Sequence, residues 1–257
     1  MKINCISQYN HFPRSQDPNA PKVYNDGKIW EYLQEPGQGD SALLIEPRPL
    51  QPELYTALET KWWKFTHIFT HDSQLLAIAP NAAKIHYWNE YELHDEEKTR
   101  DFSMICSDKG MCPLHIERKA LAEILQRDHG VEVMGTWNGG ERVSTREAHA
   151  KYRFCVIVEN YRDDWWFTEK LLNAIGSKAV PIYFGARNIA RIFHPDGILQ
   201  AEKFWDIPAI IETIKKNDPG RVYKRFTPYI NINYERVQKY KNFEDWFIKY
   251  YGESYPD

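Results

Sequence analysis

No stretch of this 257-residue chain approaches the ~20 consecutive apolar residues that a membrane-spanning helix needs. The opening MKINCISQYNHFPRSQ also lacks the apolar core of a secretory signal. We therefore expect a cytoplasmic protein without a transmembrane segment. The tail over 226–251 is rich in Tyr, Phe and Lys. Peripheral contact of this tail with a membrane surface stays open, but packing against the rest of the protein is favoured.

Cysteine is scarce, and its positions form no metal-binding pattern. Five residues separate Cys106 from Cys112, with no second pair of ligands nearby, so zinc is not expected. A disulfide between these two residues is an alternative. Because no secretory context is indicated, free thiols are the expectation, and Cys155 lies inside an apolar run.

A large excess of one charge is also lacking, since 33 basic and 36 acidic residues leave a net charge of −3 at pH 7. No basic run stands out, so nucleic acid is not an expected partner. We find no internal repeat and no low-complexity segment. The length and the 42% hydrophobic content allow a full core, in one large domain or, as we prefer, two smaller ones.

The segment 152–185 carries the clearest structural pattern. Residues 154–158 form an apolar run without polar alternation, which is typical of a strand buried on both faces of a parallel sheet. A helix is predicted from Thr168, a residue type that caps helices, to Gly176. The apolar run 179–184 follows directly. The sequence therefore predicts a compact βαβ crossover.

Polar side chains gather at one rim of this predicted unit. Ligands of such units bind beyond the carboxyl ends of the strands, where Glu159, Asn160, the loop 161–167 and the helix start would meet. A helix start favours phosphate, and Lys170 would add a full positive charge. Glu169 is suited to accept hydrogen bonds from ribose hydroxyls. Together these residues predict a nucleotide site.

Three aromatic residues, Trp165, Trp166 and Phe167, stand just before the predicted helix. They could form a wall for the base or the ribose. Each signal also has a structural alternative: the aromatic rings could be core, and Glu169 and Lys170 could be ordinary capping and surface charges. The combination favours the nucleotide interpretation.

This segment resembles the signature of the family-ten fucosyltransferases, the α1,3/α1,4 group, in three blocks. The family pattern runs F-E-N, a short loop, (I/V/F)-T-E-K-(L/I), a helix and (A/I)-(V/I)-P-(I/V)-Y-x-G. The chain has VEN at 158–160, FTEKL at 167–171 and VPIYFG at 180–185, with Val158 in place of the usual Phe. The blocks mark donor-site candidates: Asn160, Trp166, Thr168, Glu169 and Lys170, with Ser107, Glu159, Tyr183 and Gly185 as further ones.

The resemblance implies an α/β fold of GT-B type, with two Rossmann-like domains facing across a cleft and a reduced N-terminal one. In the donor half we expect a strand at 101–107, a helix at 115–126 and a strand at 131–135. Family members end the first strand in S-N, with an Arg near the following helix start. Ser107-Asp108 and Arg118 resemble this arrangement, although Asp108 replaces Asn. The resemblance assigns Arg118 to the diphosphate, whereas the residue pattern alone indicates a surface arginine.

The first 95 residues carry a weaker α/β pattern, with a helix expected at 29–33 and strands at 2–6, 41–47, 65–70 and 84–88. We expect an acceptor-side domain over 1–95, a donor-binding domain over 96–225 and a helical tail over 226–257 that packs back on the first domain. Further helices are expected at 187–193 and 206–216, with a local break at 217–220.

Glu46 is the preferred catalytic base. Sugar transfer with inversion needs a base to take the proton of the acceptor hydroxyl. Glu46 ends an apolar run and precedes Pro47, and the family has a Glu before Pro in the corresponding segment. Competing candidates are His71, Asp72 and Glu90. His67 and His71 could also be only loop or core histidines, which is the commoner fate of this residue type.

The adjacent residues Asp163 and Asp164 could bridge a metal ion to the diphosphate, as in metal-dependent transferases. Adjacent aspartates in a loop are more often solvated charges. The resemblance implies an enzyme without metal or cofactor, in which Arg118, Lys170 and the helix start neutralise the leaving diphosphate. The loop 161–167 would close over the donor and exclude water.

Three functions stay open. The first is transfer of fucose from GDP-fucose to a glycan, and the family implies galactose- or N-acetylglucosamine-containing acceptors in glycan biosynthesis. The second is transfer from another nucleotide sugar, such as a UDP-sugar. The shortened N-terminal half and Trp166, where the family commonly has Tyr, make it credible. The third is a non-catalytic nucleotide- or glycan-binding module. Eukaryotic family members carry a Golgi anchor, so the resemblance implies a bacterial or viral relative, or a trimmed chain.

Overall fold

A computed structural model describes the chain apart from residues 1–3, 10–11, 13, 36, 86–90 and 241–257. Within the described residues the protein forms two compact units. The first holds the residues up to 85 together with the short segment Asp163–Trp166, and the second holds 91–162 and 167–240. Each unit is built on a parallel β-sheet, which confirms the α/β class.

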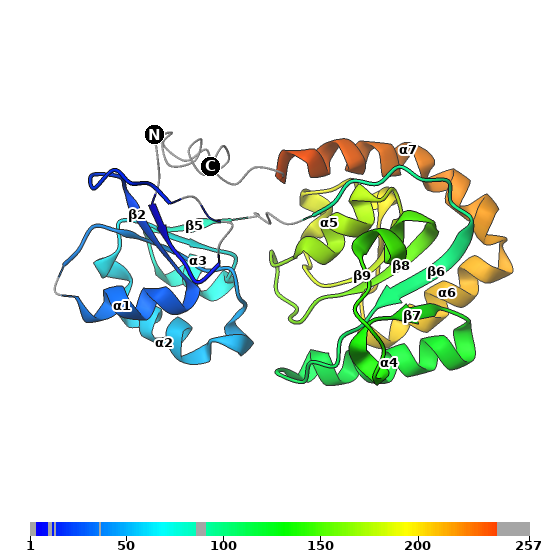
Figure 1. The fold of residues 1–257 in the computed structure, drawn as a ribbon, viewed down its shortest axis with the longest axis horizontal. Helices are drawn as coiled ribbons and strands as arrows, with labels where there is room; N and C mark the ends of the chain where they lie inside the picture. The colour runs from blue at the N-terminus through cyan, green and yellow to red at the C-terminus, as the bar shows by residue number, and fades with distance from the viewer. Residues whose placement is uncertain (1–3, 10–11, 13, 36, 86–90, 241–257) are drawn as a thin grey trace. The chain divides into compact units, whose positions relative to one another are not determined.

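The first unit has a parallel sheet with strand order β1-β2-β3-β4-β5. Its strands β2 and β5 are labelled in Figure 1. Each strand lies beside the strand that follows it in the chain, and the order runs in one direction across the sheet. Right-handed crossovers therefore place the helices on one face of the sheet. The strands are β1 (Asn4–Ile6), β2 (Lys22–Asn25), β3 (Ser41–Leu43), β4 (Ile68–Thr70) and β5 (Ala82–Lys84). The helices are α1 (Ile29–Gln34), α2 (Pro52–Lys61) and α3 (Ser73–Ile78).

Both faces of this sheet are apolar. Side chains alternate along β3 and its extension, so Ala42 and Leu44 join the cluster under α1 and α2, while Leu43 and Ile45 join a cluster with Phe12 on the other face. The strands therefore do not alternate between apolar and polar residues, as expected for a parallel sheet that is covered on both faces.

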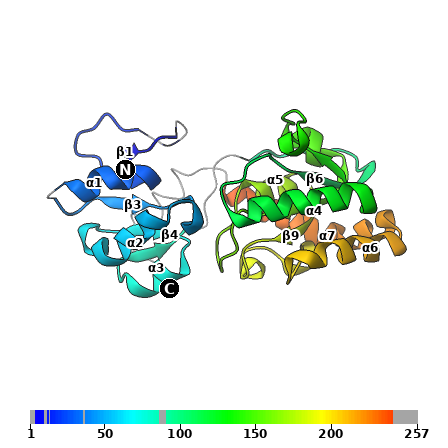
Figure 2. The ribbon, with the colours of Figure 1, turned by 90° about the horizontal axis from the view of Figure 1, so that it is seen from below.

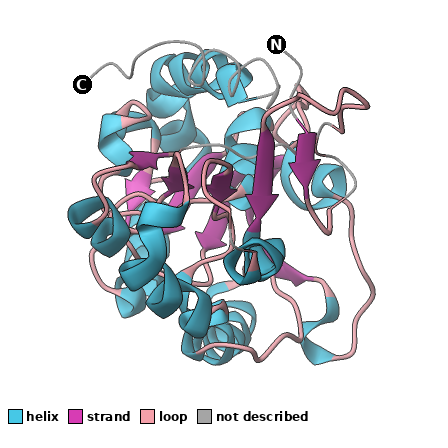
Figure 3. Ribbon diagram, turned by 90° about the vertical axis from the view of Figure 1, so that its left-hand side faces the viewer, coloured by secondary structure: helices cyan, strands magenta, loops and turns pink. Residues whose placement is uncertain are grey.

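The second unit has a parallel sheet with strand order β10-β9-β8-β6-β7. Its strands range from two to seven residues. Figure 3 distinguishes the helices of the protein, in cyan, from the strands, in magenta, and the loops, in pink. The strands are β6 (Arg100–Ile105), β7 (Glu132–Met134), β8 (Tyr152–Val158), β9 (Val180–Phe184) and β10 (Leu199–Gln200). The helices are α4 (Pro113–His129), α5 (Glu169–Gly176), α6 (Ile207–Lys216) and α7 (Pro219–Val237).

The strand order of the second unit reverses direction between β8 and β6. The chain moves from β6 outward to β7, then returns to β8 and continues to β9 and β10 on the other side. Right-handed crossovers consequently place helices on both faces. Helix α4 packs with α6 and helix α5 with α7 (Figure 1), and the view from below shows α4 in front of the sheet (Figure 2). In open sheets of this kind the reversal marks the ligand site.

Most predicted elements of the second unit are confirmed, including the strand–helix–strand unit at 152–185. The expected helix at 187–193 is only a 3-10 turn, Ile189–Arg191. In the first unit the expected strand at 84–88 is replaced by β5, which ends at Lys84, and 86–88 lie outside the described residues.

The predicted domain boundaries differ from the structure. Residues 91–95 already belong to the second unit, where the Glu92 N–H donates to Asn173 Oδ1 at 2.8 Å. The expected tail is also not separate up to residue 240. Helix α7 runs through position 226 and packs on β8 and β9 of the second unit, and the Tyr91 hydroxyl donates to the Val237 carbonyl. The rest of the tail lies outside the described residues.

All four cysteines are buried and free, so a disulfide between Cys106 and Cys112 is not formed and the expected free thiols are confirmed. Among the helices of the described residues, none has the length and apolar character to cross a bilayer.

Candidate functional site

Arg118 lies at the reversal point of the second sheet and joins the ends of its two central strands. One terminal nitrogen donates to the carbonyl of Val158 at 3.3 Å and to Asn160 Oδ1 at 2.9 Å. The other donates to Ser107 Oγ at 3.3 Å. The side chain is buried, with 4% of the residue exposed, and its Nε has no hydrogen-bond partner among the described residues. The surface-arginine interpretation is therefore wrong, and the structure brings Arg118, Asn160 and Ser107 together.

His115 belongs to the same cluster and was not among the residues predicted from the sequence. It precedes Arg118 by one helical turn on α4, and its Nδ1 accepts the Met111 N–H at 3.1 Å. Burial, and next the Arg118 charge, lower the pKa of His115, so the imidazole is neutral at pH 7. Its place three residues before Arg118 on one helix face was the available signal.

The start of α5 is held by Glu159. The Thr168 N–H and hydroxyl each donate to one oxygen of the Glu159 carboxylate at 2.8 Å. Thr168 Oγ1 in turn caps the helix by accepting the Lys170 N–H at 3.3 Å. Glu159 is fully buried, and this burial raises its pKa against the opposing charge of Lys170. Glu159 and Thr168 therefore anchor the helix start and present no open surface to a ligand.

Lys170 and Glu169 are the exposed charges of this helix start. Their side chains are 33% and 38% exposed, with Lys170 Nζ 3.3 Å from Glu169 Oε1 and 3.7 Å from Glu159 Oε2. Burial and the charge of Arg118 lower the pKa of Lys170, but the two carboxylates outweigh them and leave it raised. Lys170 is thus a cation at neutral pH, close enough to Arg118 for the two charges to interact.

Tyr183 and Gly185 serve packing. The Tyr183 ring is fully buried, and its hydroxyl accepts the Ala186 N–H at 2.9 Å. A Cβ added at Gly185 would lie 2.2 Å from the Tyr183 oxygen and 2.6 Å from Glu159 Cγ. Only glycine fits there, so these positions shape the support of Glu159 and are not ligand contacts.

Trp166 does not form the expected aromatic wall of the donor site. It is 2% exposed and belongs to the first unit, where its indole N–H donates to the Ile45 carbonyl at 3.0 Å. The ammonium nitrogen of Lys84 lies over the Trp165 ring, 3.4 Å from the ring centroid. The Trp166 ring is therefore enclosed by protein, and Lys84 covers one face of the Trp165 ring.

Asp163 is not a solvated charge, contrary to the expectation for the aspartate pair. It is 6% exposed, accepts the Ser73 hydroxyl at 2.9 Å and lies 3.8 Å from His71 Nδ1. No group of His, Cys, Asp and Glu side chains suited to a metal ion occurs among the described residues.

Glu46 follows the third strand of the first unit and is half-buried. Its Oε1 accepts the Tyr9 hydroxyl at 3.3 Å, and its carbonyl accepts the Tyr55 hydroxyl at 2.7 Å. Its N–H donates to Asp26 Oδ1 at 3.2 Å. The backbone is therefore held on both sides while the carboxylate keeps open surface.

The competing candidates for the base have structural partners. Asp72 caps α3 and binds Arg48 with both oxygens, at 2.7 and 2.9 Å. His71 is 3% exposed, with its Nε2 3.3 Å from the Tyr55 hydroxyl. Glu90 lies outside the described residues. Glu46 is the candidate whose carboxylate is both described and accessible.

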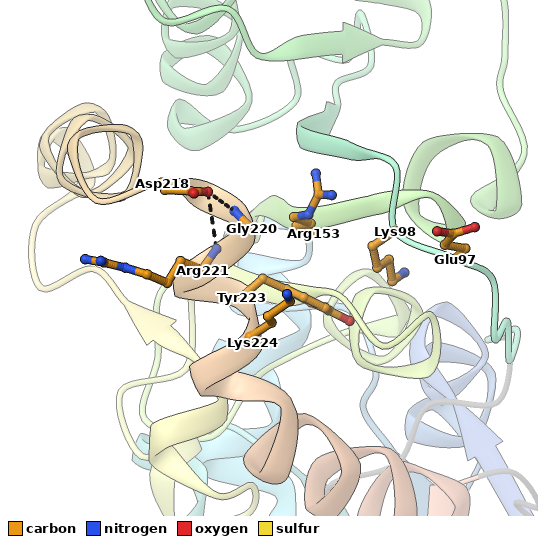
Figure 4. Close-up of a pocket in the computed structure, with 8 residues that line it drawn as sticks. All are labelled: Glu97, Lys98, Arg153, Asp218, Gly220, Arg221, Tyr223 and Lys224. Carbon is orange, nitrogen blue, oxygen red and sulfur yellow. Dashed lines mark hydrogen bonds between the residues drawn. The ribbon is translucent and has the colours of Figure 1, made fainter.

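A pocket of about 500 Å³ lies at the opposite, amino-terminal side of the second sheet, where Lys98 and Arg153 precede or begin strands (Figure 4). Two of its charges, Asp218 and Arg153, already have partners within the protein. Asp218 accepts the N–H groups of Gly220 and Arg221 at the start of α7, and Arg153 binds Asp101 at 2.6 Å. This pocket is therefore separate from the cationic cluster of Arg118 and Lys170.

The fold is of the GT-B glycosyltransferase class, as its likeness to solved structures shows. An α1,3-fucosyltransferase solved with GDP matches with a TM-score of 0.54 and 16% identity, over 88% of this chain and 78% of that one. TarM from S. aureus, in a mutant form solved with Fondaparinux, α-GlcNAc-glycerol and UDP, matches with a TM-score of 0.59 and 11% identity, over 90% and 55%.

The chain belongs to glycosyltransferase family 10, the fucosyltransferases. The model of the C-terminal part of that family matches residues 96–249, more than half of the chain. An α-(1,4)-fucosyltransferase of Arabidopsis thaliana is 34% identical over 74 residues, 28% of this chain and 18% of that protein. An α-(1,3)-fucosyltransferase C of Drosophila melanogaster is 29% identical over 111 residues, 40% and 26% respectively. The chain thus matches only about a quarter or less of these relatives' length.

Proposed function

We propose that the protein is an inverting, metal-independent transferase that moves fucose from GDP-fucose to a hydroxyl group of a glycan. The observation that carries this proposal is the pair of cations, Arg118 and Lys170, gathered at the reversal point of the second sheet beside the start of α5. Glu159 and Glu169 already lie beside Lys170, and a nucleotide diphosphate would add an anion that both cations and the helix start can bind. Membership of the fucosyltransferase family supports GDP-fucose as the donor.

In this proposal each residue of the cluster has a separate role. Arg118 and Lys170 bind the diphosphate, and Glu169, whose carboxylate is partly exposed, accepts the ribose hydroxyls. Ser107 and Asn160 orient the Arg118 guanidinium through their hydrogen bonds.

The transfer would be a single displacement. The acceptor oxygen attacks C1 of fucose as the bond from C1 to the phosphate oxygen breaks, and Glu46 takes the acceptor's proton. GDP leaves with the bonding electron pair, and Arg118 and Lys170 stabilise its growing charge. Attack on the face opposite the leaving group inverts the configuration at C1.

Metal independence has its own test. The two cations occupy the role that Mg²⁺ or Mn²⁺ plays in other transferases, so saturating EDTA should leave the rate of GDP release unchanged. A loss of turnover that added Mn²⁺ restores would contradict this part of the proposal.

Donor binding is tested by calorimetric titration with GDP. Replacing Lys170 or Arg118 with Ala removes a charge-assisted hydrogen bond worth about 1.5–3 kcal/mol, which corresponds to a loss of affinity of about 10–100-fold. Arg127→Ala is the matched control, because Arg127 lies at the far end of α4 with 62% of its side chain exposed. Unchanged affinity in both site variants would refute the assignment.

The same titration separates the donor alternatives. TarM, which shares the fold, was solved with UDP, so UDP is the competing nucleotide. Tighter binding of UDP than of GDP would replace fucose transfer by transfer from a UDP-sugar.

A transfer assay separates an enzyme from a binding module. With galactose- and N-acetylglucosamine-containing glycans as acceptors, Glu46→Gln should abolish most GDP release from GDP-fucose while GDP affinity is kept. Glu53→Gln, at an exposed position of the same unit, is the control. Full turnover of Glu46→Gln would exclude Glu46 as the base.

A further inference from the structure

A second carboxylate, Asp26, lies directly against the backbone of Glu46. It follows β2, the strand next to β3, and is fully buried. Its backbone has a φ of +47°, in the left-handed region that residues with a side chain seldom adopt. A turn alone would be served better by glycine, so the carboxylate at this position calls for a different explanation.

The Asp26 side chain binds the backbone of the proposed base, Glu46, and of the residue before it. Its Oδ1 accepts the N–H of Ile45 at 2.8 Å and the N–H of Glu46 at 3.2 Å. Its Oδ2 is buried and has no hydrogen-bond partner among the described residues. Burying a carboxylate with one oxygen unsatisfied costs free energy that a purely structural turn would not require.

Together, three side chains fix the direction in which the Glu46 carboxylate leaves the backbone. Asp26 holds the N–H of Glu46, the Tyr55 hydroxyl holds its carbonyl, and the Tyr9 hydroxyl binds the carboxylate itself. The Asn25 amide also donates to the Leu43 carbonyl, at the end of β3. A catalytic group needs support of this kind, because small misplacements of a reacting group are expensive.

We infer that Asp26 is a positioning residue that aims the Glu46 carboxylate at the acceptor hydroxyl. This inference rests on the proposed role of Glu46 as the base. Asp26 itself touches no substrate, since its side chain is enclosed by protein. Its loss should therefore lower kcat, with the KM for donor and the affinity for GDP unchanged.

Three substitutions separate positioning from stability. Asp26→Asn keeps an acceptor oxygen and tolerates the left-handed backbone, Asp26→Gly keeps the backbone but removes the acceptor, and Asp26→Ala removes both. We expect Asp26→Gly to lower kcat by about 10–100-fold, the effect of misplacing a catalytic group by about 1 Å. Asp26→Asn should restore most of the turnover. Asp17→Asn, at an exposed position of the same unit, is the control.

A double-mutant cycle tests whether Asp26 acts through Glu46. In the Glu46→Gln background, Asp26→Gly should cause no further loss of the residual turnover. A further loss by the same factor would overturn the positioning role while Glu46 remains the base. Full turnover of Glu46→Gln alone would instead overturn the proposed base, so the two failures are distinguishable.

Folding is checked by circular dichroism before any rate is compared. Where Asp26→Gly does not fold, Tyr55→Phe takes its place in the same cycle, because it removes the hydrogen bond to the Glu46 carbonyl and keeps the ring. A lowered kcat that vanishes in the Glu46→Gln background supports the positioning network. Unchanged kcat in the folded variant overturns it.

Discussion

The two glutamates of the signature segment differ in their surroundings and therefore in their roles. Glu159 is fully buried and receives both hydrogen bonds of Thr168, whereas the Glu169 side chain is 38% exposed beside Lys170. Sequence patterns cannot separate the two, because both stand at a predicted ligand rim. Burial separates them, since an enclosed carboxylate can only serve the protein.

Gly185→Ala should destabilise the protein strongly for a single methyl group. The new Cβ would lie 2.2 Å from the Tyr183 oxygen in a fully buried site, so overpacking should lower the free energy of unfolding by about 1–3 kcal/mol. Urea denaturation measures the change. Gly110→Ala is the control, because no described atom lies within 4 Å of the place that its methyl group would take. Equal stability of the two variants would contradict the packing role.

Asp26 should also make stability depend on pH. Burial raises its pKa from an ordinary 3.8 to about 7; the Ile45 N–H opposes this shift and the Glu46 charge adds to it. Between these values the unfolded chain releases the proton while the folded protein keeps it, so the free energy of unfolding falls as pH rises. The loss is at most about 4 kcal/mol by pH 7.

Comparison with Asp26→Asn isolates this effect from other titrating groups. The variant cannot ionise at position 26, so its stability relative to the native protein should increase from pH 4 to pH 7 and stay level above that. Chemical denaturation across this pH range provides the measurement. A difference that does not change with pH would show that Asp26 ionises alike in both states.

At the scale of elements, the start of α5 connects stability to donor binding. Thr168→Val keeps the shape of the side chain but removes the donor to Glu159 Oε2 and the acceptor for the Lys170 N–H. We expect a loss of about 1–3 kcal/mol, because buried Glu159 is left with an unsatisfied oxygen. GDP affinity should fall as well, since Lys170 and the helix N–H groups lose their fixed position.

Thr213→Val on α6 is the matched control for this helix start, because Thr213 is exposed and donates only to the Ala209 carbonyl of its own helix. Thermal unfolding and GDP titration of the two variants give the comparison. A Thr168→Val protein with normal GDP affinity would contradict the link between the cap and the site.

Elements that carry an apolar run were predictable even when short, as β1, β3 and β4 were, whereas β2, β10 and helix α2 were not predicted. The long apolar runs of β8 and β9 and the capped α5 follow from hydrophobic runs and capping residues, and all three were predicted. The sequences of β2 (KVYN) and β10 (LQ) contain no apolar run, and pairing with neighbouring strands stabilises both. The local break expected at 217–220 is confirmed as the junction between α6, which ends at Lys216, and α7, which Asp218 caps.

At the scale of the whole molecule, the two units have separate apolar cores and separate roles in the proposed reaction. GDP should therefore protect the second unit locally. We expect slower amide hydrogen exchange at 107–118 and 167–171 on saturation with GDP, followed by mass spectrometry. Arg118→Ala should remove this protection. Slower exchange confined to the first unit would contradict a donor site at the reversal point.

The sequence by itself determined the α/β class, the βαβ unit at 152–185 and the likeness to family 10, because these depend on apolar runs, caps and short motifs that are local in the chain. Only the tertiary structure decided which signature residues are buried and which are exposed. Arg118 reaches residues that follow two different strands, Glu159 and Trp166 turn into protein, and Asp26 lies behind Glu46. These relations join residues 9 to 121 positions apart, and burial, which sets their charges and partners, depends on the packing of the whole unit.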